Sequence, residues 1–207
     1  TEPPGWCRPW PWAGCTGGSP SGPWPWPSAT AAAPAGRPGP WGSTGCWPVC
    51  DVNNNPANPV INVRAWGEDP ATAGALATAF LRGVQAEGVL SCAKHFPGHG
   101  DTSSDSHLTL PLLAHSRERL AAIELPPFQQ AIAAGVASVM TAHLMLPALD
   151  GERPATLSKP VLTGLLRREL GFEGLIVTDA LVMDAITGRY GAGEAAVLAL
   201  GPAPTWC

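Results

Sequence analysis

The sequence is poor in charged residues and lacks any long apolar run. Only 14% of its 207 residues are charged, and 12 Lys and Arg against 16 Asp and Glu give a net charge of −4. This balance gives no electrostatic reason to expect a nucleic-acid partner. No apolar run reaches the roughly 18 residues that span a bilayer, so we expect no membrane-embedded segment. A charged segment followed by an apolar one is missing at the start, which favours a cytoplasmic location but leaves the compartment open.

Acidic residues and regular periodicity are also scarce in the first 50 residues, where Glu2 is the only carboxylate. This segment holds seven of the nine tryptophans, twelve of the 24 prolines and four of the six cysteines. So many prolines prevent a helix and interrupt any sheet ladder. We therefore predict that residues 1–46 and the tail 201–207 lie outside the fold, and that residues 47–200 form it.

The first segment has two interpretations. It is a polyproline-type ligand or a disulfide module built from Cys7, Cys15, Cys46 and Cys50, or it results from a shifted reading frame or a wrongly assigned start. A zinc site from the same four cysteines lacks any usual ligand spacing. Sequencing the DNA at both ends distinguishes the interpretations.

Strands and helices are expected to alternate between residues 47 and 200. Apolar runs predict strands at 47–52, 89–93, 136–140 and 174–178, and capping residues predict helices at 69–88, 116–134 with a break at Pro126, 158–171 and from about 193. Continuous rather than alternating apolar strands are typical of a parallel sheet covered by helices. The pattern therefore predicts an α/β fold, either a barrel or an open sheet.

Each of the four predicted strands ends in titratable residues, which are Asp51, Lys94 with His95, His143 and Asp179. The carboxyl ends of parallel strands line one site in barrels and in open sheets alike. After the second strand comes a polar, glycine-containing loop up to His107, where barrel enzymes often carry catalytic groups. We therefore expect an enzyme whose site lies at these strand ends.

Three motifs carry a resemblance to a known family. KHFPGHGDTSSDSH (94–107), DVNNNPANPVINVRAWGEDP (51–70) and LGFEGLIVTDALVMDAI (170–186) together resemble glycoside hydrolase family 3, and within it the bacterial β-N-acetylglucosaminidases, or β-hexosaminidases, of peptidoglycan turnover. The resemblance covers about residues 51–200. It implies a (β/α)8 TIM-type barrel, about half of which is recognisable here. It also implies retaining hydrolysis of terminal non-reducing β-N-acetylglucosamine, with a small carbohydrate as partner and no cofactor or metal.

The resemblance also implies residue roles. Asp179 matches the nucleophile, and a retaining glycosidase needs an ionised carboxylate beneath the anomeric carbon; an aspartate there can also cap a helix starting at Ala180. His107 with Asp105 matches the acid/base, a role that suits an imidazole oriented by a carboxylate. Residues that match sugar-binding positions, or are expected to line the pocket, are Lys94, His95, Arg64 and His143.

Some nearby residues are expected to be structural. Asp51 organises the pocket, His99 packs the glycine-rich turn and Asp101 fastens the loop. Arg117, Glu118 and Arg119 are expected on a solvated helix face.

Alternatives stay open at this stage. A metal hydrolase would use His95, His99, His107, His143 and Asp179, but Pro97 and Gly98 prevent His95 and His99 from sharing a helical face. Phosphorolysis is closer, since a histidine acid/base does not repel an incoming phosphate. The third alternative is an inactive, truncated barrel, because residues 1–50 lack the acidic sugar ligand that the resemblance implies and no last strand follows Leu200. Poor hydrolysis by the chain as written is therefore expected.

Overall fold

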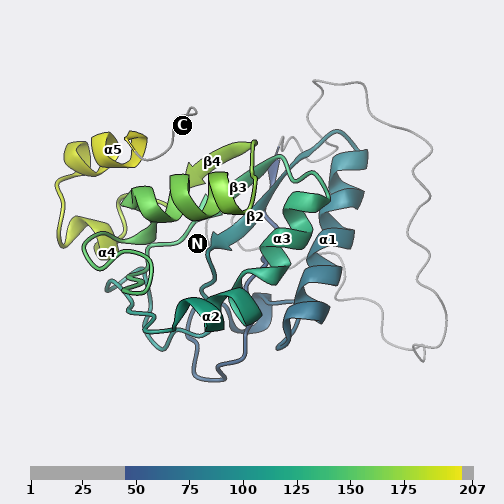
Figure 1. The fold of residues 1–207 in the computed structure, drawn as a ribbon, viewed down its shortest axis with the longest axis horizontal. Helices are drawn as coiled ribbons and strands as arrows, with labels where there is room; N and C mark the ends of the chain where they lie inside the picture. The colour runs from purple at the N-terminus through teal and green to yellow at the C-terminus, as the bar shows by residue number, and fades with distance from the viewer. Residues whose placement is uncertain (1–44, 202–207) are drawn as a thin grey trace, which may run out of the picture. The chain divides into compact units, whose positions relative to one another are not determined.

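The computed structural model describes residues 45–201, which contain one four-stranded parallel sheet (Figure 1). Its strands are β1 (Gly45–Cys46), β2 (Leu90–Phe96), β3 (Ser138–Thr141) and β4 (Leu175–Thr178), and each pairs with the next one along the chain. Every connection between neighbouring strands contains helix, as in successive units of a (β/α)8 barrel. The predicted fold class is confirmed, with four strands of a partial barrel.

Short and long helices fill these connections. They are η2 (Asn62–Arg64) and α1 (Pro70–Ala86); α2 (Arg117–Arg119), η3 (Leu120–Glu124) and α3 (Pro126–Ala133); η4 (Ala155–Leu157) and η5 (Pro160–Glu169); and, after β4, α4 (Asp184–Thr187) and α5 (Ala192–Leu200). η2 and η4 are 3-10 turns, whereas η3 and η5 have π-helical hydrogen bonding. Figure 1 shows α1 and α3 side by side along β2. No helix within residues 45–201 is long and apolar enough to cross a bilayer.

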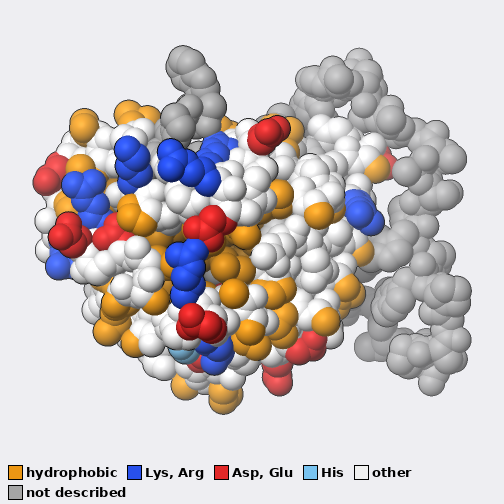
Figure 2. Space-filling model, viewed as in Figure 1, with side chains coloured by type: hydrophobic (Ala, Val, Ile, Leu, Met, Phe, Trp, Pro, Cys, Tyr) orange, Lys and Arg blue, Asp and Glu red, His pale blue; other side chains and the backbone are white. Residues whose placement is uncertain are grey.

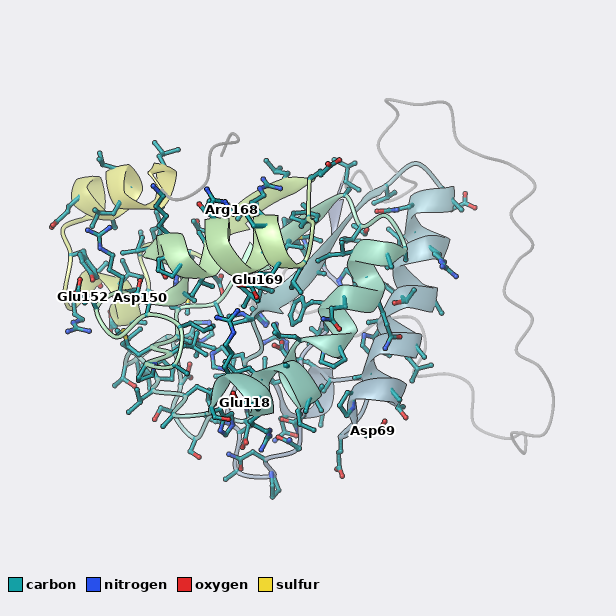
Figure 3. All side chains as sticks on the ribbon, in the orientation of Figure 1. Asp69, Glu118, Asp150, Glu152, Arg168 and Glu169 are labelled. Carbon is teal, nitrogen blue, oxygen red and sulfur yellow. The ribbon has the colours of Figure 1, made fainter. Side chains whose placement is uncertain are left out.

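The helix starts follow from side-chain caps. Asp69 accepts the backbone N–H of Thr72 at 2.9 Å, at the first turn of α1, where Figure 3 labels it. Ser116 accepts the N–H of Arg119 at 3.2 Å, and Ser158 caps the start of η5 in the same manner. Each cap satisfies an N–H that the helix leaves without a partner. The predicted starts are confirmed.

A continuous apolar core lies between the sheet and the helices. Phe96 of β2 packs edge-to-face on Phe128 of α3, with ring centroids 5.3 Å apart, and both are fully buried. Further core residues come from the strands and helices alike: Ala93, Val139, Ile176, Leu81, Leu120, Leu162 and Leu166. Burial of each large side chain stabilises the fold by roughly 1.5–3 kcal/mol. This core makes the strand ends a rigid support for the site.

The first two strands differ from their predicted bounds. The sheet starts at Gly45, ahead of the predicted boundary at residue 47, and the run 47–52 continues it only through a bridge between Val49 and Lys94. Pro48 has no N–H to donate, which interrupts the ladder, although its carbonyl accepts from Lys94. β2 continues to Phe96, so Lys94 and His95 lie within the strand and not after it.

The cysteines of the described part are free thiols. Cys46 is partly exposed, whereas Cys50 and Cys92 are buried. Burial raises the pKa of Cys92 to about 11 and that of Cys50 further. Cys7 and Cys15, like most of the segment 1–46 and the tail from 202 on, lie outside the described residues.

Candidate active site

Asp51, in the segment that follows β1, and His95 of β2 form a buried pair. The ring Nδ1–H of His95 donates to the Asp51 carboxylate at 2.7 Å, and the backbone N–H groups of His95 and His99 donate to the same carboxylate. Burial alone would raise the pKa of Asp51, but the charge and hydrogen bond of His95, together with His99, hold it below its ordinary value. Asp51 therefore stays ionised and organises the pocket, as predicted.

Lys94 lies beside this pair on β2 and precedes His95 across a cis peptide bond. Its ammonium is partly buried, and burial followed by the nearby Arg64 guanidinium lowers its pKa, against the charges of Asp179 and Asp51. Arg64 ends η2 and is exposed, with its Nη1 donating to the Val60 carbonyl at 3.2 Å. Lys94 therefore lies within electrostatic range of Arg64, the other predicted sugar ligand, and of Asp179, the predicted nucleophile.

The loop after β2 fits tightly against its surroundings. Gly98 has φ of 133°, a backbone conformation that favours glycine, and an added Cβ would come within 2.8 Å of the Glu124 side chain. A Cβ on Gly100 would lie 1.9 Å from the carbonyl oxygen of Val52. The peptide bonds Lys94–His95 and Phe96–Pro97 are cis. Because neither glycine has a side chain, the loop can lie in direct contact with Glu124 and with the backbone of Val52.

Asn58 holds two segments of the site together and was not identified from the sequence. Its Nδ2 donates to the carbonyls of His99 at 2.7 Å and of Gly100 at 2.9 Å, while its Oδ1 accepts from the N–H groups of Val60 and Ile61. The side chain is fully buried. In the sequence Asn58 follows a run of turn-forming asparagines. The only signal that could have identified it is the second Asn-Pro pair, at residues 58–59, which repeats the one at residues 55–56.

The predicted acid/base pair is formed. His107 Nδ1 lies 2.7 Å from Asp105 Oδ1, and the His107 backbone N–H donates to the same oxygen at 2.8 Å. The N–H of His107 is the main cause of a lowered pKa for Asp105; burial opposes this change, and the contact with the His107 ring lowers the pKa further. The His107 side chain is 61% exposed, so its ring is accessible to a substrate. The backbone carbonyl of His107 accepts from the Asp184 N–H at 3.3 Å, which joins this loop to the segment after β4.

Asp179 follows β4 directly and is partly buried, with Oδ1 accepting from the N–H of Ala180 at 2.8 Å. It caps no helix, because α4 begins only at Asp184, preceded by Met183. The alternative of a capping aspartate is thereby wrong.

His143 lies after β3 and is buried. Its Nε2–H donates to the carbonyl of Ala180 at 3.0 Å, and its Nδ1 contacts the Thr156 hydroxyl at 2.8 Å. Burial lowers its pKa, while Asp179 opposes that change. His143 therefore holds the backbone next to Asp179 and does not point freely into the pocket.

Arg119 was expected on a solvated helix face, and this prediction is wrong. Its Nη2 donates to Asp101 at 3.2 Å and to the buried Glu124 at 3.0 Å, and His115 Nε2 lies 2.9 Å from the same Asp101 oxygen. Asp101 thereby fastens the loop to α2 and to the residue His115 before it, as predicted. Arg117, near Arg119 in the sequence, is exposed and pairs with Glu169 of η5, which Figure 3 labels. Figure 2 shows acidic and basic side chains side by side on this face of the molecule.

The geometry does not favour a metal hydrolase. The ring nitrogens that would be ligands are already hydrogen-bonded in His99 and His143, and Nδ1 of His95 is bonded to Asp51. Within residues 45–201, the one group of potential ligands that converges is Asp101, His115 and Glu124. Arg119 already supplies the positive charge there, which disfavours a second cation.

Comparison with known proteins shows what this chain is similar to. Residues 44–202 match the Glycosyl hydrolase family 3 N terminal domain. Over 162 residues the chain is 46% identical to a protein named β-hexosaminidase A of Pseudoalteromonas piscicida, covering 72% of this chain and 27% of that protein. A structure of a family 3 β-N-acetylglucosaminidase from Paenibacillus sp. FPU-7 superposes with a TM-score of 0.74 and 53% identity, over 75% of this chain and 30% of the other.

A second similar structure is that of a protein named β-glucoside phosphorylase BglX. It has 34% identity and a TM-score of 0.72, covering 76% of this chain and 30% of that one. The chain therefore spans about a third of the length of the relatives it matches.

Proposed function

Because this chain belongs to glycoside hydrolase family 3, we propose that it carries the catalytic residues for retaining hydrolysis of terminal β-N-acetylglucosamine. One observation carries this proposal. The His107 backbone, next to its pair with Asp105, is hydrogen-bonded to the segment that follows Asp179. A nucleophile and a proton donor on neighbouring, mutually bonded segments are what the reaction requires.

In the first step, the Asp179 carboxylate attacks the anomeric carbon and forms a glycosyl-enzyme. Asp105 holds the Nδ1–H of His107, so Nε2 is the atom that transfers the proton to the departing oxygen. In the second step the same Nε2, now unprotonated, takes a proton from water as it attacks the glycosyl-enzyme, and the product keeps the β configuration. Asp105 remains an anion throughout and stabilises the imidazolium.

The substrate hydroxyl groups are assigned to Lys94, His95 and Arg64. Lys94 and Arg64 carry positive charge, and each can donate several hydrogen bonds. His95 Nδ1 is fixed by Asp51, so its Nε2 is the atom available to the sugar. His143 is assigned an indirect role: its Nε2–H holds the carbonyl of Ala180, the residue next to the nucleophile.

The test is hydrolysis of 4-nitrophenyl N-acetyl-β-glucosaminide by the chain as written and by a chain with both ends restored, with turnover expected chiefly from the restored chain. Trapping with a fluorinated N-acetylglucosaminyl donor and peptide mass spectrometry follow. We expect the β anomer as first product and the label on Asp179. Asp179→Ala and His107→Ala should abolish turnover, whereas Glu194→Gln on the exposed face of α5 serves as a matched control. A label on another side chain, or an α product, would overturn the assignment. A folded chain without turnover would favour an inactive barrel fragment.

Phosphorolysis is the second candidate, supported by the similarity to the protein named β-glucoside phosphorylase and by the histidine in the acid/base position. A neutral imidazole does not repel phosphate as a carboxylate does. Product analysis with and without phosphate separates the two reactions, because phosphorolysis yields a sugar 1-phosphate and hydrolysis yields the free sugar.

A further inference from the structure

His99 connects the sheet to the acid/base segment through its side chain. It is 2% exposed, its backbone N–H donates to Asp51 at 2.7 Å, and its ring nitrogens contact Thr102 Oγ1 at 2.7 Å and Ser106 Oγ at 3.0 Å. Ser106 lies between Asp105 and His107 in the sequence. It is itself 2% exposed, although both neighbours reach solvent.

The hydrogen bonds define which nitrogen of His99 carries the proton. The Thr102 hydroxyl donates to the His99 carbonyl at 3.1 Å, so its oxygen is left to accept from Nδ1–H. Nε2 of the neutral ring then accepts from the Ser106 hydroxyl. Burial lowers the pKa of His99, which keeps the ring neutral and this pattern intact.

The position of the His99 ring is itself fixed from the sheet side. Asn58 donates to the His99 carbonyl at 2.7 Å, and the ring of His95 packs edge-on at a centroid distance of 6.0 Å. The segment 103–107 has two other attachments to distant parts of the chain, from Asn55 to Ser103 at 3.1 Å and from Asp184 to His107 at 3.3 Å. Of the three attachments, the contact between His99 and Ser106 is the one whose two side chains are both buried.

We propose that His99 is a positioning residue for the acid/base, and that its bond to Ser106 fixes the placement of Asp105 and His107. An anchored Ser106 holds the backbone on both sides of it, so the two flanking side chains emerge together on the open side of the loop. Without the anchor, Asp105 and His107 would still pair but would be less well placed over the leaving group. This role rests on the proposed function, because it assigns His99 to the same reaction.

Two substitutions of His99 separate its two bonds. In His99→Gln the side-chain oxygen reaches the place of Nε2 and accepts from Ser106, whereas His99→Asn reaches only the place of Nδ1 and loses Ser106. We would measure kcat/KM with two N-acetyl-β-glucosaminides: a phenyl glycoside, which leaves only with protonation, and a 2,4-dinitrophenyl glycoside, which needs none. We expect His99→Asn to lose about tenfold on the phenyl glycoside, a fraction of the whole general-acid effect, and less than about threefold on the dinitrophenyl one. His99→Gln should resemble the unsubstituted chain.

A purely structural role for His99 predicts a different result. If His99→Asn only reduces the amount of folded protein, the rates on both glycosides fall by the same factor. That result would overturn the proposal. Equal losses in the Gln and Asn variants would do so as well, because the two differ in the bond to Ser106.

A second measurement does not depend on turnover. Hydrogen exchange of the His107 amide, whose N–H is bonded to Asp105 at 2.8 Å, reports the order of the segment directly. It should become about tenfold faster in His99→Asn and in the milder Ser106→Ala, but not in His99→Gln, relative to the core amide of Ala142. Unchanged protection in the Asn variant would overturn the positioning role. If the unsubstituted chain lacks turnover while exchange behaves as expected, the proposed function fails and the anchoring by His99 stands.

Discussion

Asp51 and His95 are joined by a 2.7 Å hydrogen bond although their side chains are 0% and 5% exposed. Asp51 lies in the segment that follows β1 and His95 lies in β2, so the bond ties that segment to the second strand. The same carboxylate also holds the first backbone N–H of the turn at His99. A buried charge with three donors is a precise support for a site, and its removal has measurable consequences.

Replacing Asp51 by Asn should destabilise the protein by about 2 kcal/mol at neutral pH, since hydrogen bonds to a charged group become neutral ones. The pKa of Asp51 is lowered in the folded state, so its contribution is present above its ordinary value of 3.8 and is lost as the pH falls through the lower folded value. The difference between Asp51→Asn and the unsubstituted chain should therefore shrink below about pH 4. Urea unfolding at several pH values measures this difference, and a constant gap across the range would contradict it.

Two glycines offer a matched pair of substitutions. Gly100→Ala would place a methyl group 1.9 Å from the Val52 carbonyl oxygen, a contact that only a backbone shift can relieve. We expect a loss of about 3 kcal/mol or more, as for overpacked sites. Gly83→Ala, within α1 and with no atom near the added carbon, should stabilise by about 0.5–1 kcal/mol. Urea midpoints of the two variants should move in opposite directions, and equal shifts would show that the loop can yield at Gly100.

Glu124 should impose the opposite pH dependence to Asp51. Burial raises its pKa, against the charges of Arg119 and His115, so the folded protein holds the proton more tightly than the unfolded chain. Stability from this residue therefore falls as the pH rises from about its ordinary value of 4.5 towards the folded value. In Glu124→Gln this decline should disappear, so the variant gains stability relative to the unsubstituted chain across that window. The comparison uses urea unfolding, and parallel curves for the two proteins would contradict the buried-charge argument.

The sequence predicted those parts of the molecule that depend on local pattern. Caps at Asp69, Ser116 and Ser158 were sufficient to place the starts of three helical stretches, and apolar runs were sufficient to predict a parallel sheet. The pairing of Asp105 with His107 was predictable because the two residues are close in sequence. Contacts between distant segments were not predictable in this way.

Asn58 and Arg119 illustrate this limit. Asn58 bonds to carbonyls more than 40 residues away, and Arg119 reaches into the loop from a helix that looks solvent-facing in the sequence. Nothing in the local composition distinguishes these residues from ordinary turn and surface residues. The bounds of β2 failed for a related reason, since Lys94 and His95 are polar residues that tertiary pairing keeps in the strand.

Substitutions of the two loop carboxylates, Asp105 and Asp101, should distinguish a catalytic role from a role in attaching the loop. Asp105 pairs with His107 at 2.7 Å and Asp101 with His115 at 2.9 Å, so the two pairs are chemically alike but differ in placement. Asp105→Asn retains a group that accepts the His107 N–H but removes the negative charge that stabilises the imidazolium. Turnover of the phenyl glycoside should fall about a hundredfold, the lower end of general acid–base effects, with little change in stability.

Asp101→Asn is the matched comparison, because it weakens the bonds to Arg119 and His115 without touching the acid/base. It should lower the free energy of unfolding by about 1 kcal/mol while kcat of the folded protein stays within about threefold. Urea unfolding and kcat are measured for both variants. If the assignment is right, Asp105→Asn lowers kcat with little change in stability, and Asp101→Asn lowers stability with little change in kcat. A large loss of kcat in Asp101→Asn with unchanged stability would instead move the proton-transfer role to the Asp101 and His115 pair.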